Sequence, residues 1–338
     1  MNIQSALQKA IENQNLTQEE MTDVMHQIMT GQATDSQIGG FLVAMRMKGE
    51  TVEEITAAAG VMRSLATPVE LDTTNLVEIV GTGGDGSGTF NVSTASCFVV
   101  AAAGARVAKH GNRSISSKSG AADLLETAGV NLGITAEQVK ACVDDIGVGF
   151  MFAPNHHSAM KHAIGPRKEM GVRTLFNLLG PLTNPAGTPN QILGVFSKAW
   201  VRPIADVLNK LGSNHVMVVH AEDGMDEISI SSPTFVAELK DGKVTEYTIK
   251  PEDFGMRQHP VSDIRVHDAD ESLEMVNSVL NNEANAARDI VALNAGAAIY
   301  VAGLTASHQA GIDRALEVIA SGDAKSKLLD LINKTNSF

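Results

Sequence analysis

Apolar residues in the first 66 positions recur at the spacing of an α-helix. In the segment SALQKAIENQ (5–14) they return three or four positions apart, which places them on one helix face. Thr17 precedes Glu20 by three residues, and Thr51 precedes Glu54 in the same way. Both pairs fit the capping box that starts a helix. The first 66 residues are therefore predicted to be purely helical.

One helical segment in this region is more apolar than its neighbours. The stretch DSQIGGFLVAMRMKG (35–49) carries more apolar surface than one helix can hide against a small bundle. The excess could belong to the core of the bundle. It could also form a surface for a partner, such as a dimer interface. The sequence leaves both interpretations open.

From residue 76 onward the pattern changes to short β-rich runs that alternate with helical stretches. The runs are LVEIV (76–80), ARVAKHG (105–111), IGVGFMFA (146–153), QILGVF (191–196) and HVMVVH (215–220). Such alternation predicts an α/β domain whose central sheet is mostly parallel and covered by helices. Asp241-Gly242 lies between two alternating runs and indicates an antiparallel hairpin. The Ala-rich region from Glu271 is predicted to be helical.

Composition narrows the classes of partner. The net charge of the 338-residue chain is −13, which argues against a general nucleic-acid binder or an anionic-membrane binder. Any anionic ligand must therefore meet a local positive field. Cys97 and Cys142 stand in apolar contexts and indicate buried thiols of a reducing cytoplasm. There is no secretory leader and no apolar run of about 18 residues, so we expect a soluble, cytoplasmic protein.

A glycine-rich stretch, IVGTGGDGSGTFNVSTAS (79–96), follows the first β-rich run. It fits G-x-G-x-x-G, but a dinucleotide site needs an acid about 20 residues further on. After Asp85 the next acid is Asp123, and the Gly-Lys-Ser/Thr of a Walker loop is also missing. Phosphate binding remains, through bare backbone and a helix N-terminus. The alternative is a strand–helix turn with Ser/Thr caps, for which two glycines would suffice.

Two further segments suit a phosphate-rich ligand. The stretch RVAKHGNRSISSKSGAADLLE (106–126) holds four basic residues, four serines and no acid before Asp123; a solvated loop would explain its charge but not its Ser and Gly density. The stretch HAEDGMDEISI (220–230) supplies Glu222, Asp223, Asp226 and Glu227. Alone, an acidic loop is usually just solvated. Beside two phosphate-binding loops, these carboxylates indicate Mg²⁺ and a diphosphate substrate.

Histidines offer a weaker alternative metal site. His156, His157 and His162 lie close together in the sequence. Their spacing matches no zinc pattern, and no cysteine is nearby.

Four motifs, in this order, carry a family resemblance: GTGGDGSGTFNVST, KHGNRSISSKSG, RKEMGVRTLFNLLGPLTNP and DGMDE. Together they resemble the anthranilate phosphoribosyltransferases, over essentially the whole chain. Pyrimidine nucleoside phosphorylases look like fold relatives, with a Gly-rich loop and a helical domain, but they match these motifs much less.

The resemblance implies a reaction and an architecture. The 5-phosphoribosyl group of phosphoribosyl diphosphate (PRPP) would pass to the amine of anthranilate, with Mg²⁺, two ions per subunit. Residues 1–70, joined by part of 165–185, would form a helical domain hinged to an α/β domain of residues 71–338, as in the nucleoside phosphorylase and phosphoribosyltransferase fold. The helical domains would build a homodimer. Neither nucleic acid nor a membrane is an expected partner.

The resemblance also implies roles for residues, position by position. For PRPP they are Gly81, Gly84, Asp85, Thr89, Asn91, Val92, Ser93, Thr94, Lys109, His110, Gly111, Asn112, Arg113, Ser114, Ile115, Ser116, Ser117 and Ala121. Many family members carry Ser at position 121, so Ala121 is expected to offer its backbone N–H alone. For anthranilate they are Gly81, Asn112 and Arg167, with His110 and Pro181 lining its channel. Ser93 and Glu227 would ligate one Mg²⁺, and Asp226 with Glu227 the second.

Chemistry then sets the expected mechanism. The leaving diphosphate needs its developing charge stabilised, and the weakly basic amine of anthranilate loses its proton easily after attack. No general base is therefore expected, and Lys109, Asp226 and Glu227 would act electrostatically. Two other function classes stay open: a pyrimidine-nucleoside-phosphorylase-like enzyme, and a non-enzymatic nucleic-acid-binding relative. The acidic balance and the intact DGMDE oppose the second.

Overall fold

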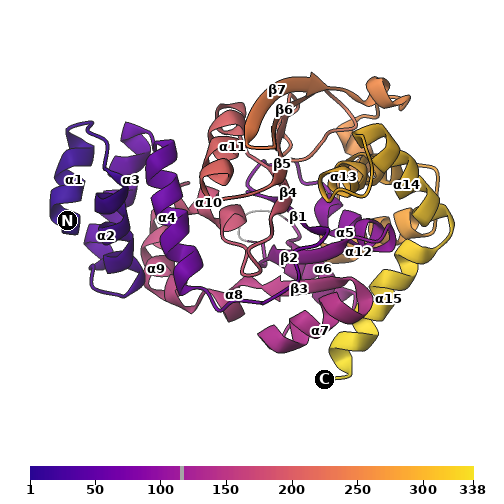
Figure 1. The fold of residues 1–338 in the computed structure, drawn as a ribbon, viewed down its shortest axis with the longest axis horizontal. Coiled ribbons are helices and arrows are strands. Elements are labelled where there is room, and N and C mark those ends of the chain that lie inside the picture. The colour runs from indigo at the N-terminus through magenta and orange to yellow at the C-terminus, as the bar shows by residue number, and fades with distance from the viewer. Residues whose placement is uncertain (115–117) are drawn as a thin grey trace.

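The computed structural model describes residues 1–114 and 118–338. The chain begins with four helices that pack side by side at one end of the molecule (Figure 1). They are α1 (Ile3–Ile11), α2 (Gln18–Met29), α3 (Asp35–Lys48) and α4 (Val52–Leu65). The predicted helical start of the chain is confirmed.

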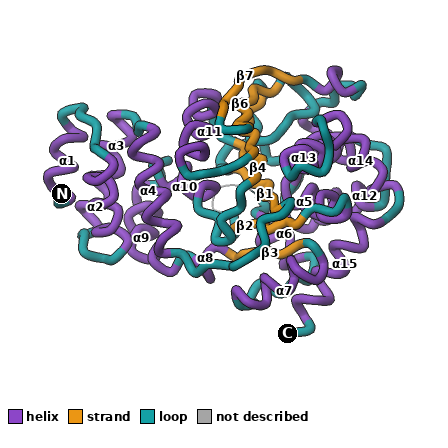
Figure 2. The backbone as a smooth tube through the Cα atoms, in the orientation of Figure 1, coloured by secondary structure: helices purple, strands orange, loops and turns teal. Residues whose placement is uncertain are grey.

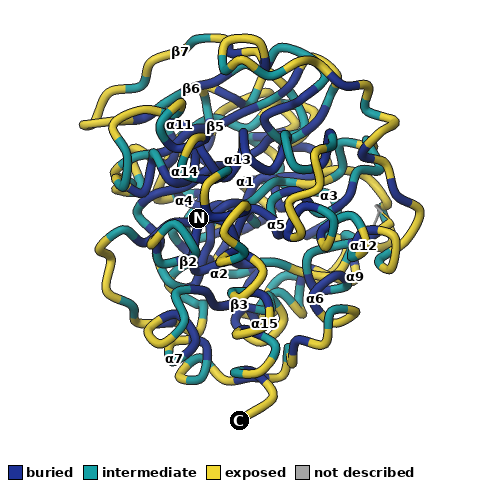
Figure 3. The backbone as a smooth tube through the Cα atoms, turned by 90° about the vertical axis from the view of Figure 1, so that its right-hand side faces the viewer, coloured by how far each residue is buried: buried dark blue, intermediate teal, exposed yellow. Residues whose placement is uncertain are grey.

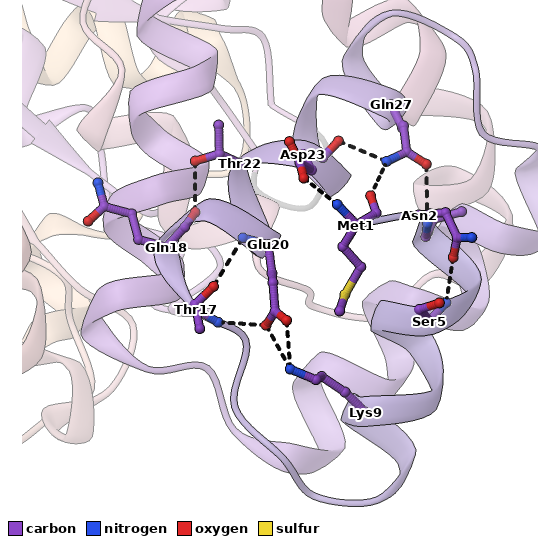
Figure 4. A network of polar contacts seen from close by, with 11 residues as sticks. Met1, Asn2, Ser5, Lys9, Thr17, Gln18, Glu20, Thr22, Asp23 and Gln27 are labelled. Carbon is purple, nitrogen blue, oxygen red and sulfur yellow. Dashed lines mark hydrogen bonds and ion pairs between the residues drawn. The ribbon is translucent and has the colours of Figure 1, made fainter.

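Both predicted capping boxes are present. The Thr17 hydroxyl accepts the N–H of Glu20, and the Glu20 carboxylate accepts the N–H of Thr17 in return (Figure 4). Lys9 from α1 donates to the same carboxylate at 2.7 Å, which ties α1 to the start of α2. Thr51 and Glu54 repeat the arrangement at α4. Each cap satisfies N–H groups that a helix start leaves without a partner.

Helix α3 buries most of its apolar sequence, and whether the rest contacts a partner stays a prediction. Phe41, Leu42 and Met45 are fully buried in the core of the bundle. Val43 and Met47 are 39% and 83% exposed. Most of the apolar excess is therefore core, and a smaller part faces outward.

The described residues form one seven-stranded sheet with the order β3-β2-β1-β4-β5-β6-β7. Its strands are β1 (Leu76–Gly81), β2 (Arg106–Gly111), β3 (Val148–Phe152), β4 (Asn190–Gly194), β5 (His215–Ala221), β6 (Thr234–Lys240) and β7 (Lys243–Ile249). The first five pair in parallel, and β6 pairs antiparallel with β5 and β7. The predicted sheet and the Asp241-Gly242 hairpin are confirmed.

Helices cover both faces of this sheet (Figure 2). On one face lie α5 (Val92–Ala102) and α13 (Ala286–Val301); on the other lies α11 (Val201–Lys210), between the sheet and α4. Successive residues of a strand point to opposite faces. In β5, accordingly, Met217 packs into the core under α5 and α13, whereas Val218 packs into the core shared with the bundle. Figure 3 shows that the buried residues concentrate in the interior, around the sheet and the helices packed on it.

The remaining helices complete the α/β part and its link to the bundle. They are α6 (Ala121–Thr127), α7 (Ala136–Ile146), α8 (Ala153–His156), α9 (Lys161–Met170), α10 (Phe176–Leu179), α12 (Ala269–Leu280), α14 (His308–Ala320) and α15 (Asp323–Asn336). Short 3₁₀ turns are η1 (Ser158–Met160), η2 (Gly180–Leu182), η3 (Lys198–Trp200), η4 (Pro251–Phe254) and η5 (Val261–Ile264).

Helix α9 returns to the first helices although it lies far along the chain (Figure 1). It packs against α2 and α3, and Leu175 and Phe176 after it enter the core of the bundle. The exact division of the chain near residue 70 stays a prediction.

Both cysteines are free and buried. No helix within residues 1–114 and 118–338 has the length and apolar character needed to cross a membrane. Placement in the cytoplasm stays a prediction.

Candidate active site

Three segments meet at the carboxyl edge of the parallel strands. The glycine loop (residues 82–91) follows β1, the basic segment continues from β2, and the acidic pair Asp226 and Glu227 follows β5. Parallel strands deliver their carboxyl ends to one edge, where ligands of open α/β sheets bind. The Gly83 N–H donates to Asp226 Oδ2 at 2.7 Å, and Lys109 Nζ donates to Ser93 Oγ at 3.3 Å. The structure therefore brings together segments more than 100 residues apart.

The glycine loop uses backbone conformations that suit glycine. Gly83 and Gly84 have φ of +66° and +73°, a region that side chains disfavour. Gly81 needs its lack of a side chain for another reason, since a Cβ there would lie 2.4 Å from Asp226 Oδ2. The end of the loop is fixed, because the Phe90 N–H donates to the Ile264 carbonyl at 3.0 Å. Glycine density here serves close approach as well as turning.

Other residues predicted for PRPP lie along this loop. Asp85 accepts the N–H of Ser87, and Thr89 forms a bridge with Arg265. The Asn91 Oδ1 accepts the hydroxyls of Ser119 and Ser272, both at 2.8 Å. Asn91 thus joins the loop to two distant segments and does not cap α5 with its side chain.

The first turn of α5 is polar but has no side-chain cap. It contains Val92, Ser93 and Thr94, and the buried Thr94 hydroxyl has no hydrogen-bond partner. Free polar groups at a helix N-terminus suit an anion, since the positive end of the helix dipole points outward there.

Lys109 is buried inside the site. Only 4% of it is exposed, and its Nζ also donates to the Ile79 carbonyl at 2.7 Å. A buried ammonium is costly unless carbonyls or anions surround it. Lys109 therefore supplies the local positive field that an acidic chain needs at an anion site.

The acidic pair is crowded with like charge. Burial raises the pKa of Asp226, and the charge of Asp85 raises it further. Burial and Asp226 likewise raise the pKa of Glu227, against the lowering effect of Lys109. Three carboxylates facing one ammonium leave a deficit of positive charge. The deficit fits a bound cation.

The segment after β2 divides into buried and paired residues. His110 is buried on β2, Gly111 ends the strand, and Asn112 is exposed. Arg113 pairs with Glu126 and, at 3.5 Å, with Asp123, so acids already neutralise it. The Asp123 carboxylate also accepts the N–H of Ser114 at 2.9 Å.

Three predicted positions in this segment, Ile115, Ser116 and Ser117, lie outside the described residues. Lys118 is exposed. Ala121 starts α6, and its Cβ would lie 3.2 Å from a Cβ added at Gly111. The fourth basic residue, Arg106, pairs with Asp72 at 3.2 Å and with Asp144. Of this predicted basic group, Lys109 is the member that faces the acidic pair.

Arg167 and Pro181, two of the residues predicted for the anthranilate site, lie toward the helical bundle. The Arg167 guanidinium lies 5.0 Å from the centre of the Phe176 ring, and burial lowers its pKa. Among the described residues no carboxylate is within ion-pair distance of it. Pro181 is buried, and its carbonyl accepts Gln191 Nε2 at 3.1 Å. A half-buried guanidinium without an acid partner suits an external carboxylate.

Sequence reasoning missed Glu78, which is fully buried in β1. Its carboxylate accepts the His110 N–H at 3.0 Å and Gln191 Nε2 at 2.8 Å. Burial raises its pKa to about 6. The signal was available, because Glu78 is the one acid inside the apolar run LVEIV. Through these bonds Glu78 connects β2 to the turn that carries Pro181.

The histidines are dispersed over different contacts. His156 Nδ1 lies 3.0 Å from the Thr67 carbonyl oxygen, His157 contacts the His110 ring at 5.0 Å, and His162 lies against Gly31 in the bundle. Within the described ranges no three His, Cys, Asp or Glu side chains form a metal-holding group on their own. Two cavities of about 290 and 440 Å³ are lined by none of the predicted site residues.

The fold and the site define a glycosyltransferase. The family model described as "Glycosyl transferase family, a/b domain" matches residues 73–325, and "Glycosyl transferase family, helical bundle domain" matches residues 4–66. The anthranilate phosphoribosyltransferase of Thioalkalivibrio sulfidiphilus is 62% identical, over 100% of both chains. The crystal structure of the Thermus thermophilus enzyme superposes with a TM-score of 0.93 at 42% identity, covering 98% of this chain and 99% of that one.

The same agreement extends to the enzyme of Saccharomyces cerevisiae. Its structure in complex with PRPP and Mg has a TM-score of 0.91 at 27% identity, covering 99% of this chain and 98% of that one. Another of its structures holds 4-fluoroanthranilate.

The chain belongs to the anthranilate phosphoribosyltransferase family. Its reaction transfers the 5-phosphoribosyl group of PRPP to the amine of anthranilate, giving N-(5-phosphoribosyl)anthranilate and diphosphate in the second step of tryptophan biosynthesis from chorismate. The phosphorylase and nucleic-acid-binding alternatives are not favoured.

Proposed function

We propose that the glycine loop, the start of α5 and Lys109 hold PRPP, and that Ser93, Asp226 and Glu227 hold two Mg²⁺ ions with its diphosphate. The observation that carries the proposal is the crowding of Asp85, Asp226 and Glu227 around one buried lysine. Such an arrangement is costly without a cation. The PRPP and Mg complex of the yeast relative supports the choice of ligand.

The oxygen atoms of these residues suit a Mg²⁺ ion that is bound partly by the protein and partly by the substrate and water. Mg²⁺ prefers oxygen ligands and is usually bound by one or two carboxylates together with substrate phosphates and waters. Asp226, Glu227 and the Ser93 hydroxyl supply such oxygens. Bound there, Mg²⁺ would supply positive charge to the departing diphosphate.

The chain's own residues then bind and orient the substrates. The N–H groups of the glycine loop and of the first turn of α5 face the phosphate oxygens, and the hydroxyls of Ser93 and Thr94 add donors. The Lys109 side chain lies beside the diphosphate as the bond between the diphosphate and the ribose weakens. Positioned charges of this kind stabilise a transition state without reorganising.

Anthranilate is held from the opposite side. Arg167 pairs with its carboxylate through two parallel hydrogen bonds, a geometry that suits a guanidinium. Asn112 and the backbone at Gly81 complete the contacts, with His110 and Pro181 lining the approach. The reacting amine then faces the anomeric carbon, and orientation supplies much of the rate.

No general base is part of this proposal. Burial lowers the pKa of His110 well below its usual range, and the neighbouring His157 lowers it further. Burial also lowers the pKa of His157 to about 4. Both rings are therefore neutral and act as walls. The proton of the amine leaves after attack, to water.

The helical bundle supplies a second proposal, a homodimer. On α1 and α3 three apolar side chains are exposed: Ile11 at 65%, Val43 at 39% and Met47 at 83%. Burial of such side chains favours association. The bundle of residues 1–70, with part of 165–185, would pair with a second copy and hinge against the α/β domain.

Calorimetry tests the assignment of the PRPP site. PRPP is titrated into wild type, into Asp226→Asn with Glu227→Gln, and into Glu222→Gln, an exposed control on the same loop. We expect Mg²⁺-dependent binding in wild type and control and its loss in the double variant. Equal binding in all three, or binding unaffected by a chelator, would remove Mg²⁺ from this site.

A further inference from the structure

The segment between α9 and α10 reaches from the helical bundle to the glycine loop. Gly171 ends α9 with φ of +63°, and Leu175 is fully buried in the core of the bundle. Between them, the Arg173 carbonyl accepts Arg46 Nη1 from α3. The backbone of Arg173 is thus anchored to the bundle, while its side chain points toward the α/β domain.

The side chain of Arg173 contacts the glycine loop and a neighbour of that loop. Its Nη2 donates to the Gly84 carbonyl, and a Cβ added at Gly84 would lie 3.7 Å from its Nε. The guanidinium lies 4.6 Å from the centre of the Phe196 ring. The Phe196 N–H in turn donates to Thr82 Oγ1 at 3.0 Å. The guanidinium therefore lies between the glycine loop and Phe196, the second residue after β4.

These contacts hold two glycine peptides that have no side chains to restrain them. Gly83 and Gly84 both have positive φ, and glycine passes easily between backbone conformations. Asp226 holds the N–H of Gly83, and Arg173 holds the carbonyl of Gly84. The loop is thus held from the α/β side by an acid and from the bundle side by an arginine.

Arg173 has no acid of its own. In the described part of the chain, no carboxylate lies within ion-pair distance of its guanidinium, and the residue is exposed. An exposed arginine gives up side-chain entropy when it holds one geometry. Its donation to a backbone carbonyl of the phosphate-binding loop thus suggests a role beyond a surface ion pair.

We propose that Arg173 is a positioning residue that couples the two substrate sites. PRPP on the glycine loop fixes Gly84, Gly84 fixes Arg173, and the short segment from Arg173 back to α9 then sets the position of Arg167. The inference rests on the proposed division of the site, with PRPP on the glycine loop and the aromatic carboxylate on Arg167. Arg173 touches neither substrate in this account.

Coupling of this kind is measured as the ratio of the affinities for one ligand with and without the other ligand bound. The ratio is the same whichever ligand is titrated. Benzoate is the probe for the second site, because it keeps the aromatic carboxylate and lacks the reacting amine. PRPP affinity is measured by calorimetry with Mg²⁺, with and without saturating benzoate. In wild type we expect benzoate to strengthen PRPP binding by about 5- to 150-fold, the usual range of such coupling.

Substitution of Arg173 should abolish the strengthening of PRPP binding by benzoate and leave the affinity for PRPP alone nearly unchanged. In Arg173→Ala we expect the strengthening to fall below about 2-fold, while PRPP alone binds within about 5-fold of wild type. Arg173→Lys should recover part of it, because an ammonium can donate to Gly84 but does not stack as well on Phe196. Lys168→Ala, on the exposed face of α9, is the matched control and should keep the full ratio.

A second variant guards against a folding defect. Arg46→Gln removes the anchor of the Arg173 backbone from an exposed position and should also lower the ratio. Full coupling in Arg173→Ala, or no coupling in wild type, overturns the inference. So does a loss of more than about tenfold in PRPP affinity alone with the ratio intact, because that marks a direct phosphate contact. Failure of wild type to bind PRPP with Mg²⁺ would instead overturn the proposed function.

Discussion

The acidic pair in the loop after β5 and a single carboxylate on β6 have pKa values shifted in opposite directions. Asp226 and Glu227, after β5, have raised pKa values because burial and mutual repulsion disfavour their charge. Glu238 lies on the neighbouring strand β6. Burial alone would raise its pKa too, but hydrogen bonds from His215, Tyr247 and Tyr300 outweigh burial and bring it to about 2.

The difference lies in the donors that surround each group. Glu238 accepts His215 Nε2 at 2.8 Å, Tyr247 at 2.8 Å and Tyr300 at 2.9 Å, so its charge is satisfied within the protein. Asp226 has backbone donors, the N–H groups of Gly83 and of Asp226 itself, and it has two acidic neighbours, Asp85 and Glu227. A satisfied carboxylate stabilises the fold. A carboxylate among other carboxylates is repelled by them, and binding of a cation from outside the protein relieves that repulsion.

The largest effect is expected from removing the charges of Asp226 and Glu227. Asp226→Asn with Glu227→Gln should lower turnover by about 10²–10³-fold or more, the usual consequence of removing a charge-stabilising group. The free energy of unfolding should stay equal or rise, because repulsion between two neighbouring, partly buried like charges disappears. Steady-state rates from anthranilate fluorescence and urea denaturation measure the two quantities. Near-normal turnover would show that the crowding has no catalytic purpose.

Substitution of Arg167 should weaken the binding of one substrate, anthranilate, and leave the other, PRPP, unaffected. Arg167→Ala is expected to weaken anthranilate by about 10- to 150-fold, which corresponds to about 1.5–3 kcal/mol for a charged hydrogen-bonded pair. PRPP saturation should barely change, and Arg167→Lys should restore part of the loss. Paired titrations in each substrate give the answer. Damage to PRPP saturation with anthranilate untouched would reverse the assignment.

A substitution in the glycine loop should have a smaller effect, and it should weaken PRPP and not anthranilate. Gly84→Val puts a β-branched residue at φ of +73°, where it is strained and blocks approach to the backbone. The Michaelis constant for PRPP should rise by about tenfold or more, equal to about 1.4 kcal/mol. The constant for anthranilate should move much less. An unchanged PRPP constant would mean that the loop is only a turn.

Glu238 should affect stability and leave catalysis unchanged. Glu238→Gln is expected to cost about 1.5–3 kcal/mol of unfolding free energy with normal turnover. Because the folded pKa is below the ordinary 4.5, this stabilisation is present above about pH 5 and is lost as the pH falls toward about 2. The gap between wild type and variant should therefore narrow in acid. A gap independent of pH would mean that packing, and not charge, makes the difference.

Local patterns were sufficient to predict much of the fold. Short β-rich runs between helical stretches predicted β1 to β5, and the Asp241-Gly242 pair predicted the hairpin. Thr17 with Glu20 predicted a helix start. Each of these signals acts over a few residues, so the neighbouring sequence contains it.

Contacts between distant segments could not be predicted in this way. The sequence predicts Asn91 as a PRPP residue, and it gives no sign that the Asn91 Oδ1 accepts the hydroxyls of Ser119 and Ser272. Arg113 reads as a phosphate ligand, yet Glu126 and Asp123 pair with it. Which partner a polar side chain finds depends on how the chain folds back.

Metal binding tests the central claim most directly, with Mn²⁺ as a paramagnetic substitute for Mg²⁺. Electron paramagnetic resonance counts the Mn²⁺ ions bound per subunit in the presence of PRPP, for wild type, for Glu238→Gln, and for Asp226→Asn with Glu227→Gln. The account predicts about two ions in the first two proteins, as expected for carboxylates shared with a diphosphate, and a loss of both in the third. Equal binding in all three would contradict it, as would a loss confined to Glu238→Gln.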